Sequence, residues 1–283
     1  MSFGMFFVGR DLPVHRLGFG TGQLVGKGYW GPRGESEDAV DVLRAAVRRG
    51  VDLIDTADNY GPGLAEELVA EALHPYPVGL VIATKGGVVR TAADAWHIDG
   101  RPESLRAMCD ASLQRLRRDR IDLYQLHRID PQVPFTDQLG ALVELRETGK
   151  IRHIGLDSVT FEQLQIALEI TEIVSVQNKF NLFDRDSEKV LDLCEQQNIA
   201  FLPWFPLGNG RLTRGESEVV NAVGKRHDAT PAQVALSWLL HRSSVLLPTP
   251  GTGSLEHLDQ NLDAGELELS HEDLTRLDAV AAK

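Results

Sequence analysis

The feature that most constrains the fold of this 283-residue chain is an alternation that repeats eight times. A short run of β-branched or apolar residues is followed each time by a longer amphipathic segment, which is typical of alternating strands and helices. The predicted strands are 16–21, 51–55, 80–84, 121–126, 151–155, 173–177, 200–203 and 245–247. The predicted helices are 36–49, 64–73, 102–116, 136–148, 160–170, 187–197, 217–227 with 231–241, and 254–261. Because no change of composition divides the repeats, we expect an α/β fold in which residues 1–283 form a single (β/α)8 TIM barrel domain.

Two further elements are predicted outside the eight repeats. Residues 6–14 have the pattern of a β-hairpin that turns through 9–11, and such a hairpin could close the bottom of the barrel. The tail from Ser270 is predicted to form a short C-terminal helix, with Ser270 as its N-cap and Asp273 three residues later.

Composition and charge exclude several classes of protein. The 29 Lys and Arg residues against 41 Asp and Glu residues give a net charge of −12, so neither a nucleic acid nor an anionic membrane is an expected partner. No apolar run approaches the ~18 residues of a membrane span. The N-terminus lacks the basic region and cleavage site of a signal peptide, which predicts a cytoplasmic protein. No heptad repeat or large apolar stripe requires a dimer, so we expect a monomer.

Motifs that would assign a function directly are absent or fail in context. Residues 26–31 have the glycine spacing of a dinucleotide-binding loop, but Pro32 follows and no helix begins there. No pair of His or Cys residues has metal-ligand spacing, so no metal site is predicted. Neither Ser nor Cys lies in a nucleophile elbow.

Four polar side chains follow or end three successive predicted strands. Asp55 ends the second strand and Tyr60 lies in the loop after it, Lys85 follows the third strand, and His127 follows the fourth. In a barrel the carboxyl ends of the strands meet at one open mouth, where catalytic groups are found. We therefore expect an acid, a phenol, an amine and an imidazole to face one cavity.

This set of groups suits the protonation of an alkoxide. A free phenol has a pKa near ~10. A neighbouring Lys85 ammonium is expected to lower the pKa of Tyr60, while Asp55 pairs with the lysine and keeps it charged. His127 is expected to donate a hydrogen bond to the substrate oxygen. The residues thus predict an acid that protonates the oxygen of a carbonyl group as hydride reaches its carbon.

The sequence around these residues resembles the aldo-keto reductases. The resemblance is carried by GVDLIDTADNYG at 50–61 and continues in GKIRHIG at 149–155, VQNKFNL at 176–182 and PWFPLG at 203–208. It implies a (β/α)8 barrel that reduces aldehydes or ketones with a nicotinamide cofactor and without a metal. It also implies that Tyr60 is the general acid, that Asp55 and Lys85 tune it, and that His127 positions the substrate.

A cofactor site is expected at the loops after the seventh and eighth strands. The loop 247–254 leads into a helix, and its glycines let backbone N–H groups approach a phosphate. By resemblance, Trp204 stacks on the nicotinamide and Gln177 binds its carboxamide. The complete predicted set is Asp157, Ser158, Gln177, Trp204, Leu207, Gly208, Gly210, Gly251, Thr252, His257 and Asn261.

The sequence departs from the family pattern in two places. Asp157-Ser158 stands where Ser-Asn is usual, and an aspartate there is expected to favour the oxidised, positively charged nicotinamide. Gly251 and His257 stand where many members place a lysine and an arginine against the 2′-phosphate. We expect NADPH as cofactor, with NADH left open.

The substrate pocket is predicted to be lined by Tyr29, Trp30, Trp96 and Arg128. The runs 16–20, 23–26 and 71–76 are similar to a bacterial subgroup that includes pyridoxal reductases, which makes pyridoxal the leading specific substrate beside a general aldehyde or diketone reductase. Two other functions remain open. Lys85 could form a Schiff base in a lyase or aldolase, or the barrel could be a non-catalytic subunit that senses nicotinamide nucleotides.

Overall fold

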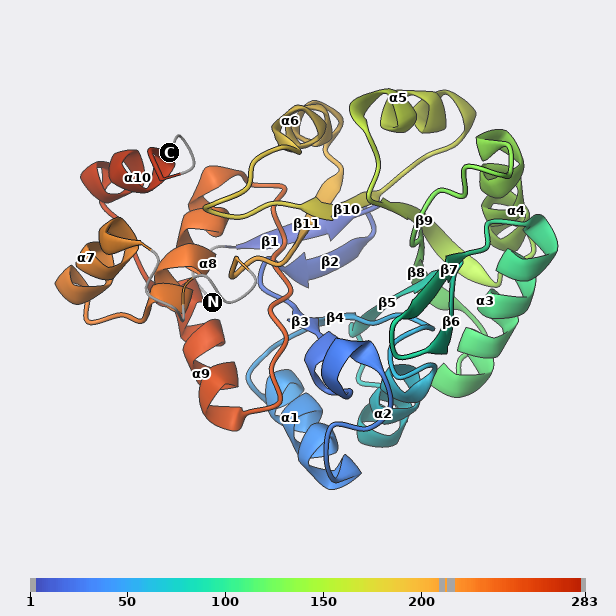
Figure 1. The fold of residues 1–283 in the computed structure, drawn as a ribbon, viewed down its shortest axis with the longest axis horizontal. Coiled ribbons are helices and arrows are strands. Elements are labelled where there is room, and N and C mark those ends of the chain that lie inside the picture. The colour runs from blue at the N-terminus through green and yellow to red at the C-terminus, as the bar shows by residue number, and fades with distance from the viewer. Residues whose placement is uncertain (1–3, 209–211, 213–216, 281–283) are drawn as a thin grey trace.

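Seven parallel strands form one curved sheet in the order β11-β10-β9-β8-β5-β4-β3 (Figure 1). The structure is a computed structural model that describes residues 4–208, 212 and 217–280. The strands of the sheet are β3 (Phe19–Gly20), β4 (Leu53–Asp55), β5 (Val81–Gly86), β8 (Ile121–Leu126), β9 (Ile151–Asp157), β10 (Ser175–Lys179) and β11 (Ala200–Trp204). The predicted α/β barrel is therefore confirmed.

The eighth predicted strand closes the ring without forming a regular ladder. Leu246 makes a single parallel bridge with Phe201 of β11. On the other side, the Gly18 N–H donates to the Pro248 carbonyl at 3.0 Å, just before β3. Proline has no N–H to donate, so Pro248 and Pro250 prevent this segment from continuing as a strand.

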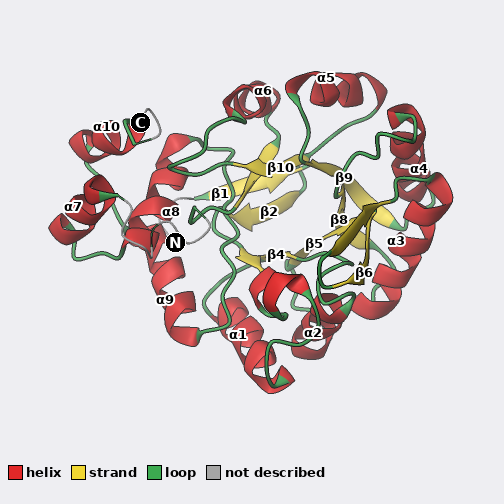
Figure 2. Cartoon of the chain, in the orientation of Figure 1, coloured by secondary structure: helices red, strands yellow, loops and turns green. Residues whose placement is uncertain are grey.

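Helices surround the strands and form the outer layer (Figure 2). They are α1 (Ser36–Arg48), α2 (Leu64–Leu73), α3 (Pro102–Leu116), α4 (Phe135–Glu147), α5 (Phe161–Ile170), α6 (Glu188–Gln197), α7 (Glu218–Arg226), α8 (Pro231–Arg242), α9 (Leu255–Asp263) and α10 (His271–Asp278). Capping boxes at Thr160, Thr230 and Ser270 begin α5, α8 and α10. The predicted C-terminal helix is thus confirmed. Within the described ranges, no helix has the length and apolar character needed to cross a bilayer.

The predicted N-terminal hairpin covers the bottom of the barrel. It consists of β1 (Met5–Val8) and β2 (Leu12–His15), and Val8 and Val14 are fully buried against the core. Asp11 in its turn contacts His153 Nε2 at 2.7 Å, and His15 Nδ1 contacts Asp52 at 2.7 Å. His153 lies near the amino end of β9, and Asp52 immediately precedes β4. The hairpin therefore leaves the opposite end of the barrel open.

A second hairpin, which the sequence analysis did not predict, lies in the loop between β5 and α3. It consists of β6 (Val88–Ala92) and β7 (Ala95–Ile98). The Arg90 guanidinium lies 3.7 Å from the centre of the Trp96 ring and donates to the carbonyl of Gly28 at 2.9 Å. These contacts join this hairpin to the loop between β3 and α1 at the mouth of the barrel.

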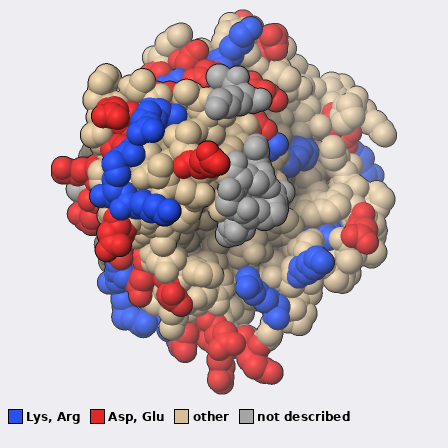
Figure 3. Space-filling view, turned by 60° about the vertical axis from the view of Figure 1, so that its left-hand side comes forward, with Lys and Arg blue, Asp and Glu red and all other residues tan. Residues whose placement is uncertain are grey.

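Acidic and basic side chains are interspersed over much of the molecular face shown in Figure 3.

Candidate active site

A cavity of about 600 Å³ opens at the carboxyl ends of the barrel strands. Asp55, Tyr60 and His127 line its floor, as the order of the strands predicts. Lys85 lies directly beneath and is completely buried. The structure therefore brings together the four residues that sequence analysis selected.

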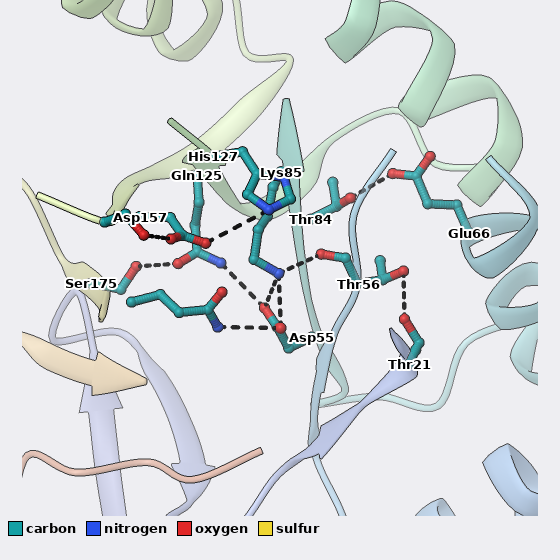
Figure 4. Close-up of polar contacts among 12 residues, drawn as sticks. Thr21, Asp55, Thr56, Glu66, Thr84, Lys85, Gln125, His127, Asp157 and Ser175 are labelled. Carbon is teal, nitrogen blue, oxygen red and sulfur yellow. Dashed lines mark hydrogen bonds and ion pairs between the residues drawn. The ribbon is translucent and has the colours of Figure 1, made fainter. Parts of the chain in front are cut away.

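The Lys85 ammonium is held by three oxygens (Figure 4). Nζ lies 2.9 and 2.8 Å from the two carboxylate oxygens of Asp55 and 2.8 Å from the carbonyl of Thr56. Side-chain amides of Gln125 and Gln177 donate to the same carboxylate at 3.3 and 3.2 Å. An ammonium has three N–H donors, and each finds an acceptor here. The lysine is thus fixed as a cation next to its counter-ion.

Tyr60 lies between two aromatic rings above this ion pair. The Tyr29 ring stacks on it at 5.1 Å and the His127 ring meets it edge-on at 6.1 Å, while Lys85 Nζ lies 5.3 Å from its centre. Burial, and then the negative charge of Asp55, raise the pKa of Tyr60 well above 10. The predicted lowering by Lys85 is therefore wrong, because Asp55 compensates the ammonium and burial disfavours the phenolate.

His127 is buried and neutral. Burial, and then the charges of Lys85 and Arg128, hold the pKa of His127 well below 6.5. Its Nε2 lies 3.9 Å from a carboxylate oxygen of Asp157, and its Nδ1 has no hydrogen-bond partner among the described residues. Unpaired buried polar atoms are rare in folded proteins and call for an explanation. Because His127 lines the cavity as a neutral imidazole, it can contact a polar ligand there.

Asp157 is buried beside His127 and has a cationic partner. Arg128 Nη1 lies 2.6 Å from its Oδ1, and the Ser158 hydroxyl donates to the same oxygen at 2.7 Å. Burial raises the pKa of Asp157 to about 6. Its predicted preference for oxidised cofactor stays a prediction, and the Arg128 charge is expected to reduce that preference.

The other end of the cavity has the features of a dinucleotide site. It is lined by Trp204, Leu207, Gly251, Thr252 and His257 next to the start of α9. A Cβ at Gly251 would stand 2.4 Å from the carbonyl oxygen of Gly20, so only glycine fits this close approach of two loops. The Trp204 Nε1 has no partner among the described residues. A glycine-rich loop that leads into a helix N-terminus fits an anionic cofactor.

Several predicted site residues do not line this cavity. Trp30 is one of them, and its predicted role stays a prediction: its ring lies 5.5 Å from the Arg90 guanidinium in the adjacent loop. Tyr29, Trp96 and Arg128 do line it, as does Gln177. Ser158, Gly208 and Asn261 lie outside its lining. The Ser158 hydroxyl instead donates a hydrogen bond to Asp157. Gly210 falls outside the described residues.

Sequence analysis missed three contributions from the loop between β3 and α1. Gly22, Gln23 and Arg33 line the cavity, and only Gln23 lies in a run, 23–26, that the sequence marked. The glycine spacing of 26–31 contributes a turn with a positive φ at Gly28.

Comparisons with known proteins agree with this geometry. The profile of the Aldo/keto reductase family matches residues 16–282. An uncharacterized oxidoreductase of Schizosaccharomyces pombe is 45% identical over 268 residues, which cover 95% of this chain and 87% of the relative. Pyridoxine 4-dehydrogenase of Escherichia coli is 38% identical over 287 residues, which cover 99% of both chains.

Solved structures show the same fold. The glycerol dehydrogenase of Gluconobacter oxydans superposes with a TM-score of 0.89 at 27% identity and covers 100% of this chain and 96% of its own. An aldo-keto reductase from Klebsiella pneumoniae in complex with NADPH gives a TM-score of 0.81 at 28% identity and covers 99% of this chain and 96% of its own.

Proposed function

Because this chain belongs to the aldo/keto reductase family, we propose that it uses NADPH to reduce an aldehyde or ketone to an alcohol, with Tyr60 as the proton donor. The observation that carries this proposal is the position of the Tyr60 phenol. It lies at the cavity floor, beside the neutral His127 and above the buried Lys85–Asp55 pair. Among the described residues of the site, no other tyrosine lies beside both His127 and the Lys85–Asp55 pair.

The protonation states of these residues suit a carbonyl reduction. Because the pKa of Tyr60 is raised, the phenol keeps its proton at neutral pH and can donate it to the carbonyl oxygen. The Lys85 ammonium then stabilises the phenolate that remains. His127, as a neutral imidazole, donates its N–H to the same oxygen and orients the substrate. NADPH supplies the hydride when it is bound.

The cofactor is held by the residues around the far end of the cavity. Trp204 and Gln177 are proposed to contact the nicotinamide, and Thr252 with the Gly251 backbone the phosphates. We assign supporting roles in the same site to Asp157, Ser158, Leu207, Gly208, Gly210, His257 and Asn261. The NADPH complex of the Klebsiella pneumoniae relative supports this choice of cofactor.

Within the broader class of aldehydes and ketones, pyridoxal is the leading specific substrate. The Arg128 side chain, which is 36% exposed, lies at the cavity wall, and Arg128 follows His127 in the chain. The aromatic rings of Tyr29 and Trp96 lie 6.1 Å apart at the same mouth. An aromatic aldehyde with a phenolic oxygen would meet both an aromatic wall and a cation. The similarity to pyridoxine 4-dehydrogenase supports this class. A general aldehyde or diketone substrate is the alternative.

A direct assay of NADPH consumption tests the proposal. Purified protein is mixed with NADPH and a panel of carbonyl compounds that includes pyridoxal, and the loss of the reduced cofactor is followed. We expect Tyr60→Phe to lower kcat by about 10²- to 10⁴-fold while NADPH still binds. Tyr76→Phe is the matched control, because its hydroxyl donates to the Leu116 carbonyl away from the cavity. Full activity of Tyr60→Phe would refute the assigned proton donor.

The same experiments separate the alternative functions. NADPH binding without consumption of any carbonyl would favour the sensing subunit. A Schiff base on Lys85 is disfavoured by the structure, because its ammonium is fully buried and its three donors are occupied. Borohydride trapping of Lys85 with a carbonyl substrate would reverse that conclusion. The monomeric state and the cytoplasmic location stay predictions from the sequence.

A further inference from the structure

Arg33 lies against the neighbouring loop that precedes α9. It lies in the loop between β3 and α1, and its Nη1 donates to the Gln23 carbonyl at 2.6 Å. A Cβ built on Gly253 would stand 3.1 Å from its Cζ and 3.2 Å from Nε and Nη1. The guanidinium therefore lies against the backbone of the cofactor loop, and the absence of a side chain at Gly253 makes room for it.

Among the described residues, no carboxylate compensates the charge on Arg33. No acidic residue of the described ranges forms an ion pair with it, whereas Arg128, the other arginine of the cavity lining, is paired with Asp157 at 2.6 Å. Arg33 lines the same cavity as Thr252 and His257. An unpaired guanidinium next to two potential hydrogen-bond donors is a favourable place for a phosphate.

The position of Arg33 within the cavity indicates which phosphate group of the cofactor it would contact. The resemblance to the aldo-keto reductases places the 2′-phosphate at Gly251 and His257, where this chain lacks the usual lysine and arginine. Arg33 comes to that place from the adjacent loop, which follows β3. We propose that Arg33 binds the 2′-phosphate of NADPH and thereby sets the preference for NADPH over NADH. This role rests on the proposed function of the site.

The test is a comparison of binding affinities rather than of activities. The dissociation constants of NADPH and NADH are measured by quenching of tryptophan fluorescence for the wild type, Arg33→Ala and Arg33→Lys. We expect Arg33→Ala to weaken NADPH about 10- to 100-fold, the range for a charge-assisted hydrogen bond, and to change NADH by less than about twofold. Arg33→Lys should recover part of the NADPH affinity, because it keeps the charge but loses the planar fork.

Controls separate this role from a structural one. Arg276→Ala removes an exposed arginine of α10, and it should leave both constants unchanged. Equal urea midpoints for wild type and Arg33→Ala would show that the fold is intact. An equal loss of affinity for NADPH and NADH would overturn the proposal, because Arg33 would then contact a part that both share. Unchanged affinities would also overturn it. Failure of the wild type to bind either nucleotide would refute the cofactor assignment itself.

Discussion

The Lys85–Asp55 pair allows a quantitative test of how the active-site floor is held together. Lys85 is completely buried and the Asp55 side chain is 8% exposed, so neither charge is hydrated when its partner is removed. Breaking a buried pair on one side costs about 3–5 kcal/mol, and the long amide contacts of Gln125 and Gln177 offset little of it. We expect Lys85→Met and Asp55→Asn each to lower the free energy of unfolding by about 3 kcal/mol.

The double variant distinguishes a coupled pair from two independent losses. Lys85→Met/Asp55→Asn leaves no unpaired charge, so we expect it to be about as stable as either single variant. This corresponds to a coupling energy of about 2–3 kcal/mol. The free energies are measured by urea unfolding followed by circular dichroism at pH 7.

An exposed pair provides the matched control. Lys150 Nζ lies 2.5 Å from Asp110, and the two side chains are 39% and 46% exposed. Lys150→Met and Asp110→Asn should each cost less than about 1 kcal/mol. The reasoning would be refuted if Lys85→Met and Asp55→Asn each lowered the free energy of unfolding by less than about 1 kcal/mol. It would also be refuted if the loss in the double variant equalled the sum of the two single losses.

Two further predictions concern pH and loop packing. Because burial raises the pKa of Asp157 from 3.8 to about 6, its contribution to stability is present at low pH and is lost as the pH rises through 6. Relative to wild type, Asp157→Asn should gain about 2–3 kcal/mol between pH 4 and 7 in urea unfolding, and a difference that stays constant over this range would contradict the prediction. Gly251→Ala should lose about 1–3 kcal/mol, because its Cβ would meet the Gly20 carbonyl at 2.4 Å. Gly140→Ala in α4, with nothing within 4 Å, should gain about 0.5–1 kcal/mol, and the opposite order of the two glycine variants would contradict the packing of the loops.

Much of the fold could be predicted because its signals are local. The helices α2 and α3 have the predicted bounds, since apolar periodicity and Pro102 mark them in the sequence. The first strand was predicted as 16–21, but only Phe19–Gly20 forms a ladder, and the last has only the bridge of Leu246. Glycines in the first and prolines near the last shorten these two strands, which meet where the barrel closes.

The sequence predicted which residues form the site better than it predicted their pKa values. Strand ends place Asp55, Lys85 and His127 at one mouth, and the structure confirms this grouping. The pKa of Tyr60 depends on burial and on the exact partner of Lys85, which spacing does not reveal. Arg33 lies in a loop without periodicity, and its contact with Gly253 spans 220 residues of sequence; only the folded chain shows it.

The hairpin at the bottom of the barrel has a consequence for the order of folding. Its turn residue Asp11 contacts Arg152 and His153, which lie 141 and 142 positions further along the chain. The contacts of Asp11 can therefore form only after β9 has been made, whereas the contact of His15 with Asp52 spans only 37 positions. Contacts of such separation form late, because the chain must first lose the entropy of a long loop. We therefore expect the turn of the hairpin to dock on β9 late in folding, so that the bottom of the barrel is closed only after β9 is in place.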